Sequence, residues 1–158
     1  MPELRALSIR QPWAWAIATQ EKDVENRSWQ THYRGLIAVH ASRRLDEDAV
    51  IPAPAAAEAL QVLRAEVTLA HRLTPSAEHM RLGRIVAVAE ITGCHEDGEC
   101  EREWGFCSPW AQRFQWHWQL SGVRPLAEPV PCKGALGLWR VPDDIESAIR
   151  AQLEASRA

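Results

Sequence analysis

The sequence predicts an α+β fold, a small mixed β-barrel of about five or six strands flanked by helices. Arg84–Thr92 is a near-continuous apolar run, which is typical of a buried strand. Arg113–Leu120 alternates large apolar and polar residues as a half-buried strand does, which would turn its tryptophans inward and His117 outward. Asp143–Ser156 carries apolar residues at helical spacing and is expected to form a surface helix.

The N-terminal part is expected to hold two strands with a helix between them. Leu4–Ile9 is predicted to be a strand. Pro12 suits a first helical turn because its missing N–H would have no partner there, and the helix should cover Trp13–Thr19. Glu21–Trp29 is interpreted as a loop leading into an extended segment, and Gly35–Ala41 as a strand because branched apolar residues follow a glycine.

The remaining elements complete one domain over residues 1–158. Alanine-rich Ala55–Leu73 is predicted to be a helix that ends before Pro75. Val123–Pro129 and Leu136–Val141 are expected to be the last two strands, followed by the C-terminal helix at about 143–156. No apolar run approaches the roughly 18 residues that cross a bilayer, so we expect a cytoplasmic protein without a membrane partner.

The charge is spread unevenly along the chain. Its net value of −3 argues against a protein that coats nucleic acid indiscriminately. Residues 1–44 nevertheless hold seven Lys or Arg against four acids, whereas residues 94–107 hold five acids and one Arg. A basic face opposed by an acidic loop fits a compact anionic ligand or a short strand. Arginines dominate the cations, and Lys22 and Lys133 are the only lysines.

The segment from Lys22 to Trp29 is the first candidate site. If it is extended, Glu25, Arg27 and Trp29 line one side, because residues two apart share a face of a strand. A carboxylate, a guanidinium and an aromatic plane could contact a base edge while stacking on its ring. The alternative is an Arg–Glu surface ion pair beside a partly buried Trp.

Two further groups of residues are weaker candidates. Trp13 at a helix start could stack on a base, although a core position is the alternative. His40, Ser42 and Arg43 end a predicted strand together with Arg44, and paired arginines beside a hydroxyl could hold a phosphate. A solvated strand end is the simpler interpretation. There is no Gly-rich phosphate loop, nucleophile elbow or HExxH motif.

The four cysteines leave a metal site open. In a reducing compartment we expect thiols rather than disulfides. Gaps of five and six residues between the first three cysteines are wider than structural zinc sites usually show. A site could still use Cys94, Cys100 and Cys107 with either His95 or Cys132, but buried thiols are the default. We therefore predict no metal and no cofactor.

Several motifs together resemble the ASCH domain family, which belongs to the PUA-like superfamily. They are Leu7-Ser-Ile-Arg-Gln-Pro-Trp13, Lys22-x-x-Glu25-x-Arg27, the segment from Trp29 through Tyr33-Arg-Gly to His40-Ala-Ser42, Gly83–Ile91, and Lys133-Gly-x-Leu-Gly-Leu-Trp139. The resemblance covers roughly residues 4 to 142. The glycine that the family usually carries two residues before the lysine is Gln20 here.

The resemblance implies a PUA-like β-barrel with a cleft that binds single-stranded RNA or a modified nucleoside or nucleotide. By this resemblance, Lys22, Glu25 and Arg27 are expected in the cleft, with Trp13 and Ser42 beside them. The resemblance also implies that Lys133 and Trp139 lie toward the same opening. Tyr33 lies within the matching motif. The alternative is a hydrolase acting on N4-acylated cytidine or, as a ribonuclease, on RNA, with Lys22 as the base. The small amidohydrolases carry a threonine where this chain has Glu25, which weakens that alternative.

Overall fold

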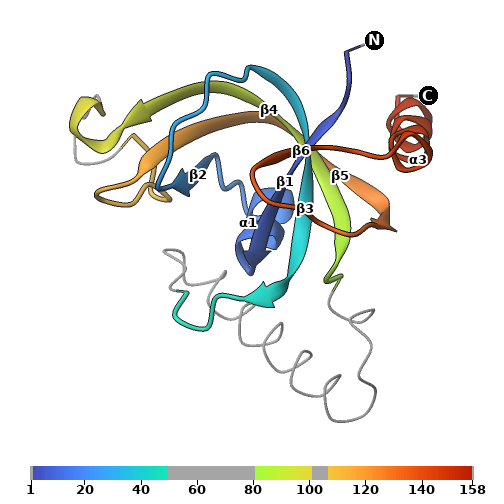
Figure 1. Cartoon of the computed structure of the whole chain (residues 1–158), viewed down its shortest axis with the longest axis horizontal. Coiled ribbons are helices and arrows are strands. Elements are labelled where there is room, and N and C mark those ends of the chain that lie inside the picture. The colour runs from blue at the N-terminus through green and yellow to red at the C-terminus, as the bar shows by residue number, and fades with distance from the viewer. Residues whose placement is uncertain (1, 50–80, 101–106, 158) are drawn as a thin grey trace.

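The computed structural model describes residues 2–49, 81–100 and 107–157 and shows a mixed α+β architecture (Figure 1). Its strands are β1 Arg5–Gln11, β2 Val24–Arg27, β3 Gly35–Leu45, β4 Arg84–Glu96, β5 Trp116–Pro131 and β6 Leu138–Arg140. Its helices are α1 Trp13–Thr19 and α3 Asp143–Ala155, and a short 3₁₀ turn, η2, covers Asp97–Glu99. The helix predicted at Ala55–Leu73 lies outside the described residues. No helix in the described ranges is long and apolar enough to cross a membrane.

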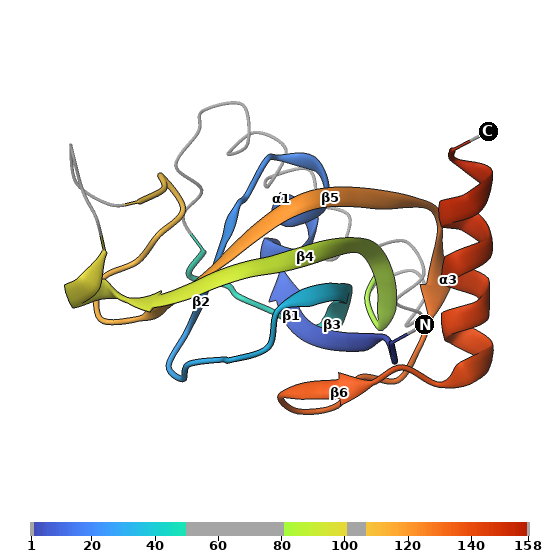
Figure 2. The same ribbon diagram turned by 90° about the horizontal axis from the view of Figure 1, so that it is seen from above.

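The six strands form one mixed sheet in the order β2-β5-β4-β3-β1-β6. β1 runs parallel to β3, and the other neighbouring pairs are antiparallel. Figure 2 shows β4 and β5 as two long curved ribbons side by side. Between the edge strands β2 and β6 no pairing joins the described residues, so the sheet is open there and the predicted barrel is not confirmed.

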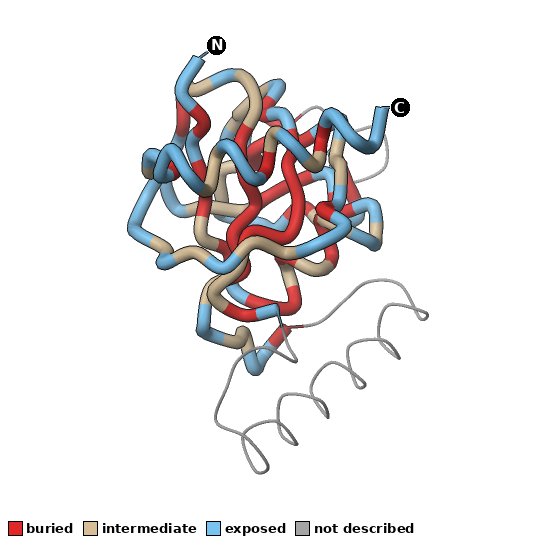
Figure 3. The backbone as a smooth tube through the Cα atoms, turned by 90° about the vertical axis from the view of Figure 1, so that its right-hand side faces the viewer, coloured by how far each residue is buried: buried red, intermediate tan, exposed pale blue. Residues whose placement is uncertain are grey.

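Both faces of the sheet are packed, because side chains two apart along a strand share a face. On one face Leu7 and Ile9 of β1 join a cluster with Ile17 of α1. On the other face Ala6 joins a second cluster that includes Ile149 of α3. Figure 3 shows the buried backbone segments gathered in the centre of the molecule. The two helices therefore cover opposite faces and leave the rim formed by the strand ends free for a site.

Most strands differ from their predicted bounds, and β3, for example, continues past Ala41 to Leu45. β4 continues beyond Thr92 to Glu96 because its polar end still pairs with β5. The strands predicted at Arg113–Leu120 and Val123–Pro129 are one strand, β5, whose pairing with β4 shifts register three times. Gly122 lies inside β5 with φ of +56°, a conformation that glycine adopts without steric cost. The gap between the two predicted strands, residues 121–122, therefore lies inside one continuous strand.

Candidate functional site

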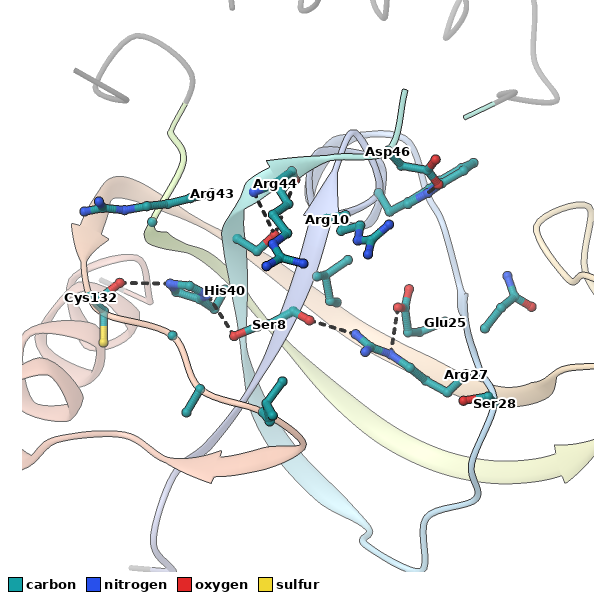
Figure 4. Close-up of a pocket in the computed structure, with 18 of the residues that line it drawn as sticks. Ser8, Arg10, Glu25, Arg27, Ser28, His40, Arg43, Arg44, Asp46 and Cys132 are labelled. Atoms are coloured by element: carbon teal, nitrogen blue, oxygen red, sulfur yellow. Dashed lines mark hydrogen bonds and ion pairs between the residues drawn. The ribbon is translucent and has the colours of Figure 1, made fainter. Parts of the chain in front are cut away.

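A groove with a volume of about 1400 Å³ opens between β1, β2, β3, the start of α1 and the loop at residues 131–136. Figure 4 shows a row of side chains across it, which runs through Arg43, His40, Ser8, Arg27 and Glu25. Six cationic side chains line the groove, namely Arg10, Lys22, Arg27, Arg43, Arg44 and Lys133. The carboxylates that line it are Glu25 and Asp46. The groove is therefore positively charged in a chain whose net charge is −3.

The predicted triad of Lys22, Glu25 and Arg27 converges on one wall of the groove. Nζ of Lys22 donates to Oε2 of Glu25 at 2.9 Å and to the carbonyl of Val24. Nε of Arg27 lies 3.1 Å from Oε1 of Glu25 as an ion pair without hydrogen-bond alignment. Nη2 of Arg27 donates to the carbonyl of Ser8 at 2.8 Å. Two cations thus share one carboxylate, which leaves one positive charge uncompensated.

The turn before β2 places Lys22 in this cluster. Gln20, which stands where the family usually has glycine, has φ of −121°, and the left-handed conformation falls on Glu21 at φ of 57°. Few non-glycine residues adopt that conformation. The backbone N–H of Lys22 donates to the carbonyl of Ala16 at 3.2 Å, which ties the turn to α1. Lys22 is 2% exposed as a result.

A second polar chain links Ser8 and His40 below the loop at residues 131–136. The parallel register of β1 and β3 puts these residues directly opposite one another. Nε2 of His40 lies 2.9 Å from the carbonyl of Cys132 and must donate to it, so Nδ1 accepts from Oγ of Ser8 at 3.0 Å. Nε1 of Trp139 donates to the same Oγ at 3.1 Å. A Cβ added to Gly134 would lie 2.7 Å from Oγ of Ser8, so only glycine allows this close approach.

The buried His40 predicts acid sensitivity. Burial, reinforced by the charge of Arg43, lowers its pKa, although its bond to Cys132 opposes the shift. The unfolded chain therefore binds the proton more readily, and stability is lost as pH falls below the ordinary pKa of about 6.5. For this one proton the slope is at most about 1.4 kcal/mol per pH unit. His40→Gln keeps an amide donor for Cys132 and should flatten the slope in urea denaturation; an unchanged slope would contradict this assignment.

The tryptophans of the groove differ in how freely they can stack. Trp29 is 38% exposed and meets Trp118 edge to face at 4.6 Å between ring centroids. Trp118 is fully buried, so it supports Trp29 from behind. Trp13 is half-buried, its Nε1 donates to Asp46 at 2.7 Å, and Nζ of Lys22 lies 5.7 Å from its ring centroid. Trp29 offers the more accessible aromatic surface.

The groove contains nine of the eleven predicted site residues. Besides the triad it is lined by Trp13, Trp29, His40, Ser42, Arg43 and Lys133. Trp139 does not line it but contacts the ring of His40 edge to face at 5.5 Å. Tyr33 does not line it either, because its hydroxyl donates to the carbonyl of Leu36 and its ring faces Arg5. Sequence reasoning did not single out Ser8, Arg10 and Asp46 as lining residues, although Ser8 and Arg10 lie in the Leu7–Trp13 motif.

The expectation that His117 faces outward is wrong. The residue is fully buried, because loop residues 107–115 cover the face of β5 that should have met solvent. Nε2 of His117 lies 2.6 Å from the carbonyl of Gln112, and Nδ1 lies 3.4 Å from Nε2 of His95 and 3.7 Å from Sγ of Cys107. This cluster adjoins the groove through Gln112, which lines its wall.

Comparison with known protein families adds one finding. The family model for the ASCH domain matches residues 7–129, which is well over half of the chain. The matched range begins in β1 and ends in β5, so it includes the triad, the Ser8–His40 pair and both groove tryptophans. The loop at residues 131–136 and α3 lie beyond it. No protein with a curated description matches the chain.

Proposed function

The chain belongs to the ASCH domain family, and from this premise we propose that its groove binds single-stranded RNA or a modified nucleotide. One observation carries the proposal. Four cations, Arg10, Arg43, Arg44 and Lys133, line the same groove as the accessible ring of Trp29, and no carboxylate among the described residues pairs with any of the four. Cations free to meet phosphate and an aromatic surface free to stack are what single-strand binding requires.

The phosphate contacts fall to Arg43 and Arg44 at the end of β3 and to Lys133 in the facing loop. Arg43 and Arg44 are exposed, and arginine can hold a phosphate with two parallel hydrogen bonds. Lys133 adds a point charge across the groove. Because the groove lies at strand ends and not along a broad face, it suits a few nucleotides better than a long duplex.

The base would lie against Trp29 and meet the triad with its edge. The carboxylate of Glu25 holds the guanidinium of Arg27 in place, and that guanidinium can donate to a base that presents an acceptor at its edge. The uncompensated charge of the triad also favours a carbonyl oxygen or a phosphate at the same place. Glu25 is 6% exposed, so a ligand would reach mainly Arg27 unless the wall moves.

Hydrolysis of an acylated cytidine or of RNA is the second candidate function. The observation that favours it is the 3.0 Å contact between Oγ of Ser8 and Nδ1 of His40, the arrangement of a hydroxyl nucleophile and its base. Lys22 is less suited to be that base, because its Nζ already donates to Val24 and Glu25 inside the wall. Its side chain would then position Glu25 and not move a proton.

The test is titration of the full chain with short single-stranded RNAs and cytidine derivatives, with the mixtures also read by mass spectrometry. We expect saturable binding whose affinity falls with salt with a log–log slope of about −3 or shallower, since four cations can each replace about 0.7 counterion. Trp29→Ala should weaken binding about tenfold, because one stacked base is worth about 1–3 kcal/mol.

Phe114 supplies the matched control for that variant. It is an 89% exposed aromatic residue that does not line the groove, so Phe114→Ala should bind as the wild type does. Binding that stays flat at low salt across all ligands would rule out the proposal. Strand cleavage or loss of the acyl group in the same mixtures would replace binding with the hydrolytic alternative.

A further inference from the structure

Two histidines and two cysteines meet at the end of the β4–β5 pair. His95 and His117 lie directly opposite one another in the antiparallel register, Cys100 follows η2, and Cys107 begins the next described segment. One potential ligand atom from each of the four residues lies within 4.8 Å of all the others. His117 and Cys100 are buried, His95 is half-buried and Cys107 is exposed. The cluster is therefore reachable from solvent on one side.

Two of the separations between these atoms match those of tetrahedral ligands around a single ion, and the whole set lies within 4.8 Å, so the remaining ligands would move closer on binding. Zinc bonds of about 2.0–2.1 Å to nitrogen and 2.3 Å to sulfur place two nitrogens about 3.3 Å apart and a nitrogen about 3.6 Å from a sulfur. Nδ1 of His117 lies 3.4 Å from Nε2 of His95 and 3.7 Å from Sγ of Cys107. Both observed separations agree with a shared ion to within about 0.2 Å.

Neighbouring groups orient the ligands as the outer shell of a metal site does. Nε2 of His117 must donate its hydrogen to the carbonyl of Gln112 at 2.6 Å, which turns the lone pair of Nδ1 toward the cluster. The backbone N–H of Cys107 donates to Sγ of Cys100 at 3.2 Å, a contact that a thiolate accepts more strongly than a thiol. These contacts hold Nδ1 of His117 and Sγ of Cys100 in place within the cluster.

We propose that His95, Cys100, Cys107 and His117 hold a structural zinc ion. Two thiolates and two imidazoles in a tetrahedral arrangement select Zn²⁺ among the common divalent cations. Four protein ligands leave no open position, so the ion would brace the fold and not bind substrate. Cys94 and Cys132 are outside the site, since Sγ of Cys94 accepts from the backbone of Thr31 and Cys132 lies by the groove.

The ion would stabilise one wall of the groove. Residues between Cys107 and His117 include Gln112 and Gln115, both of which line the groove. The side chain of Asn26 in β2 binds this loop twice at 2.9 Å, to the carbonyl of Trp110 and the N–H of Gln112. Because Asn26 lies between Glu25 and Arg27, a zinc ion that fixes the loop also fixes the strand that carries the triad.

The first test is the metal content of the full chain, purified under reducing conditions from cells supplied with zinc and measured by mass spectrometry. We expect one zinc per chain in the wild type and its loss in Cys100→Ser and Cys107→Ser. Cys132→Ser is the matched control, because it removes a cysteine outside the cluster and should keep one zinc. A wild type without zinc, or the same zinc content in Cys107→Ser, would overturn the proposal.

A second measurement needs no variant and so does not depend on whether the variants fold. Cobalt(II) bound to the zinc-free wild-type chain should give the intense visible bands of a tetrahedral ion and a thiolate charge-transfer band in the near ultraviolet. Weak octahedral bands, or a Cys100–Cys107 disulfide in the freshly reduced protein, would overturn it. Chelation should lower the unfolding temperature by several degrees, and added zinc should restore it, because binding and folding are coupled. An unchanged unfolding temperature would contradict the structural role of the ion.

Discussion

The double variant Arg43→Glu/Arg44→Glu is expected to bind single-stranded RNA about 100-fold more weakly than the wild type at low salt. Each arginine is exposed, lines the groove and lacks a carboxylate partner among the described residues. Removing a hydrogen bond to a charged group costs about 1.5–3 kcal/mol, so two lost phosphate contacts amount to about 3 kcal/mol or more, which corresponds to at least two orders of magnitude in affinity. The introduced carboxylates add repulsion.

The salt dependence separates this explanation from misfolding. Losing two phosphate contacts should make the log–log slope of affinity against salt shallower by about 1.4. Arg34→Glu/Arg157→Glu changes the net charge by the same amount at exposed positions that do not line the groove, and it should bind nearly as the wild type does. If both double variants weaken binding equally, the interaction reflects net charge, and the groove is not the binding site.

Local sequence patterns predicted most of the elements because those elements are amphipathic or continuously apolar. The helix at Trp13–Thr19 has the predicted bounds, and the closing helix, α3, falls within the predicted range of about 143–156. The apolar run from Arg84 forms the centre of the sheet as β4. In each case the period of the apolar residues reports directly on the face that is buried.

The features that local patterns did not predict depend on tertiary contacts. The end of β4 is polar and is a strand only because β5 pairs with it, and the alternation of β5 did not reveal that a loop covers His117. Two strands were predicted at Arg113–Leu120 and Val123–Pro129, but the pairing with β4 makes them one strand. The pattern within a short stretch of sequence does not indicate which distant residues will pair with it or cover it.

The candidate site shows the same division. Lys22, Glu25 and Arg27 are close in sequence, and their convergence was predicted from a short motif. Ser8 accepts from Arg27 with its carbonyl and lies opposite His40 because β1 runs parallel to β3, and no local pattern indicates either partner. The Cys–His cluster was considered with Cys94 and without His117, because His117 reaches it only through the pairing of β4 with β5.

Glu25→Gln is expected to lower the free energy of unfolding by about 3 kcal/mol, the largest loss of stability that a change of one functional group should cause in the groove. The carboxylate compensates Lys22 at 2.9 Å and Arg27 at 3.1 Å, and the side chains of Lys22 and Glu25 are 2% and 8% exposed. Removing one partner of a buried ion pair typically costs about 3–5 kcal/mol because the other charge stays buried and unpaired. Arg27 is 23% exposed and can turn to water, which places the expected loss at the lower end.

Two further variants show whether this loss comes from unpaired charge. Lys22→Met keeps the volume and leaves Glu25 paired with Arg27, so it should destabilise the protein less than Glu25→Gln does in urea denaturation. The double variant Lys22→Met/Glu25→Gln should recover part of the stability that Glu25→Gln loses. It also removes the Lys22 cation, which Glu25→Gln alone leaves buried without a carboxylate partner. Glu21→Gln, at an exposed position one residue before Lys22, should change stability by less than about 0.5 kcal/mol. Additive losses in the double variant would mean that Glu25 stabilises the wall through packing and hydrogen bonds and not by compensating the charge of Lys22.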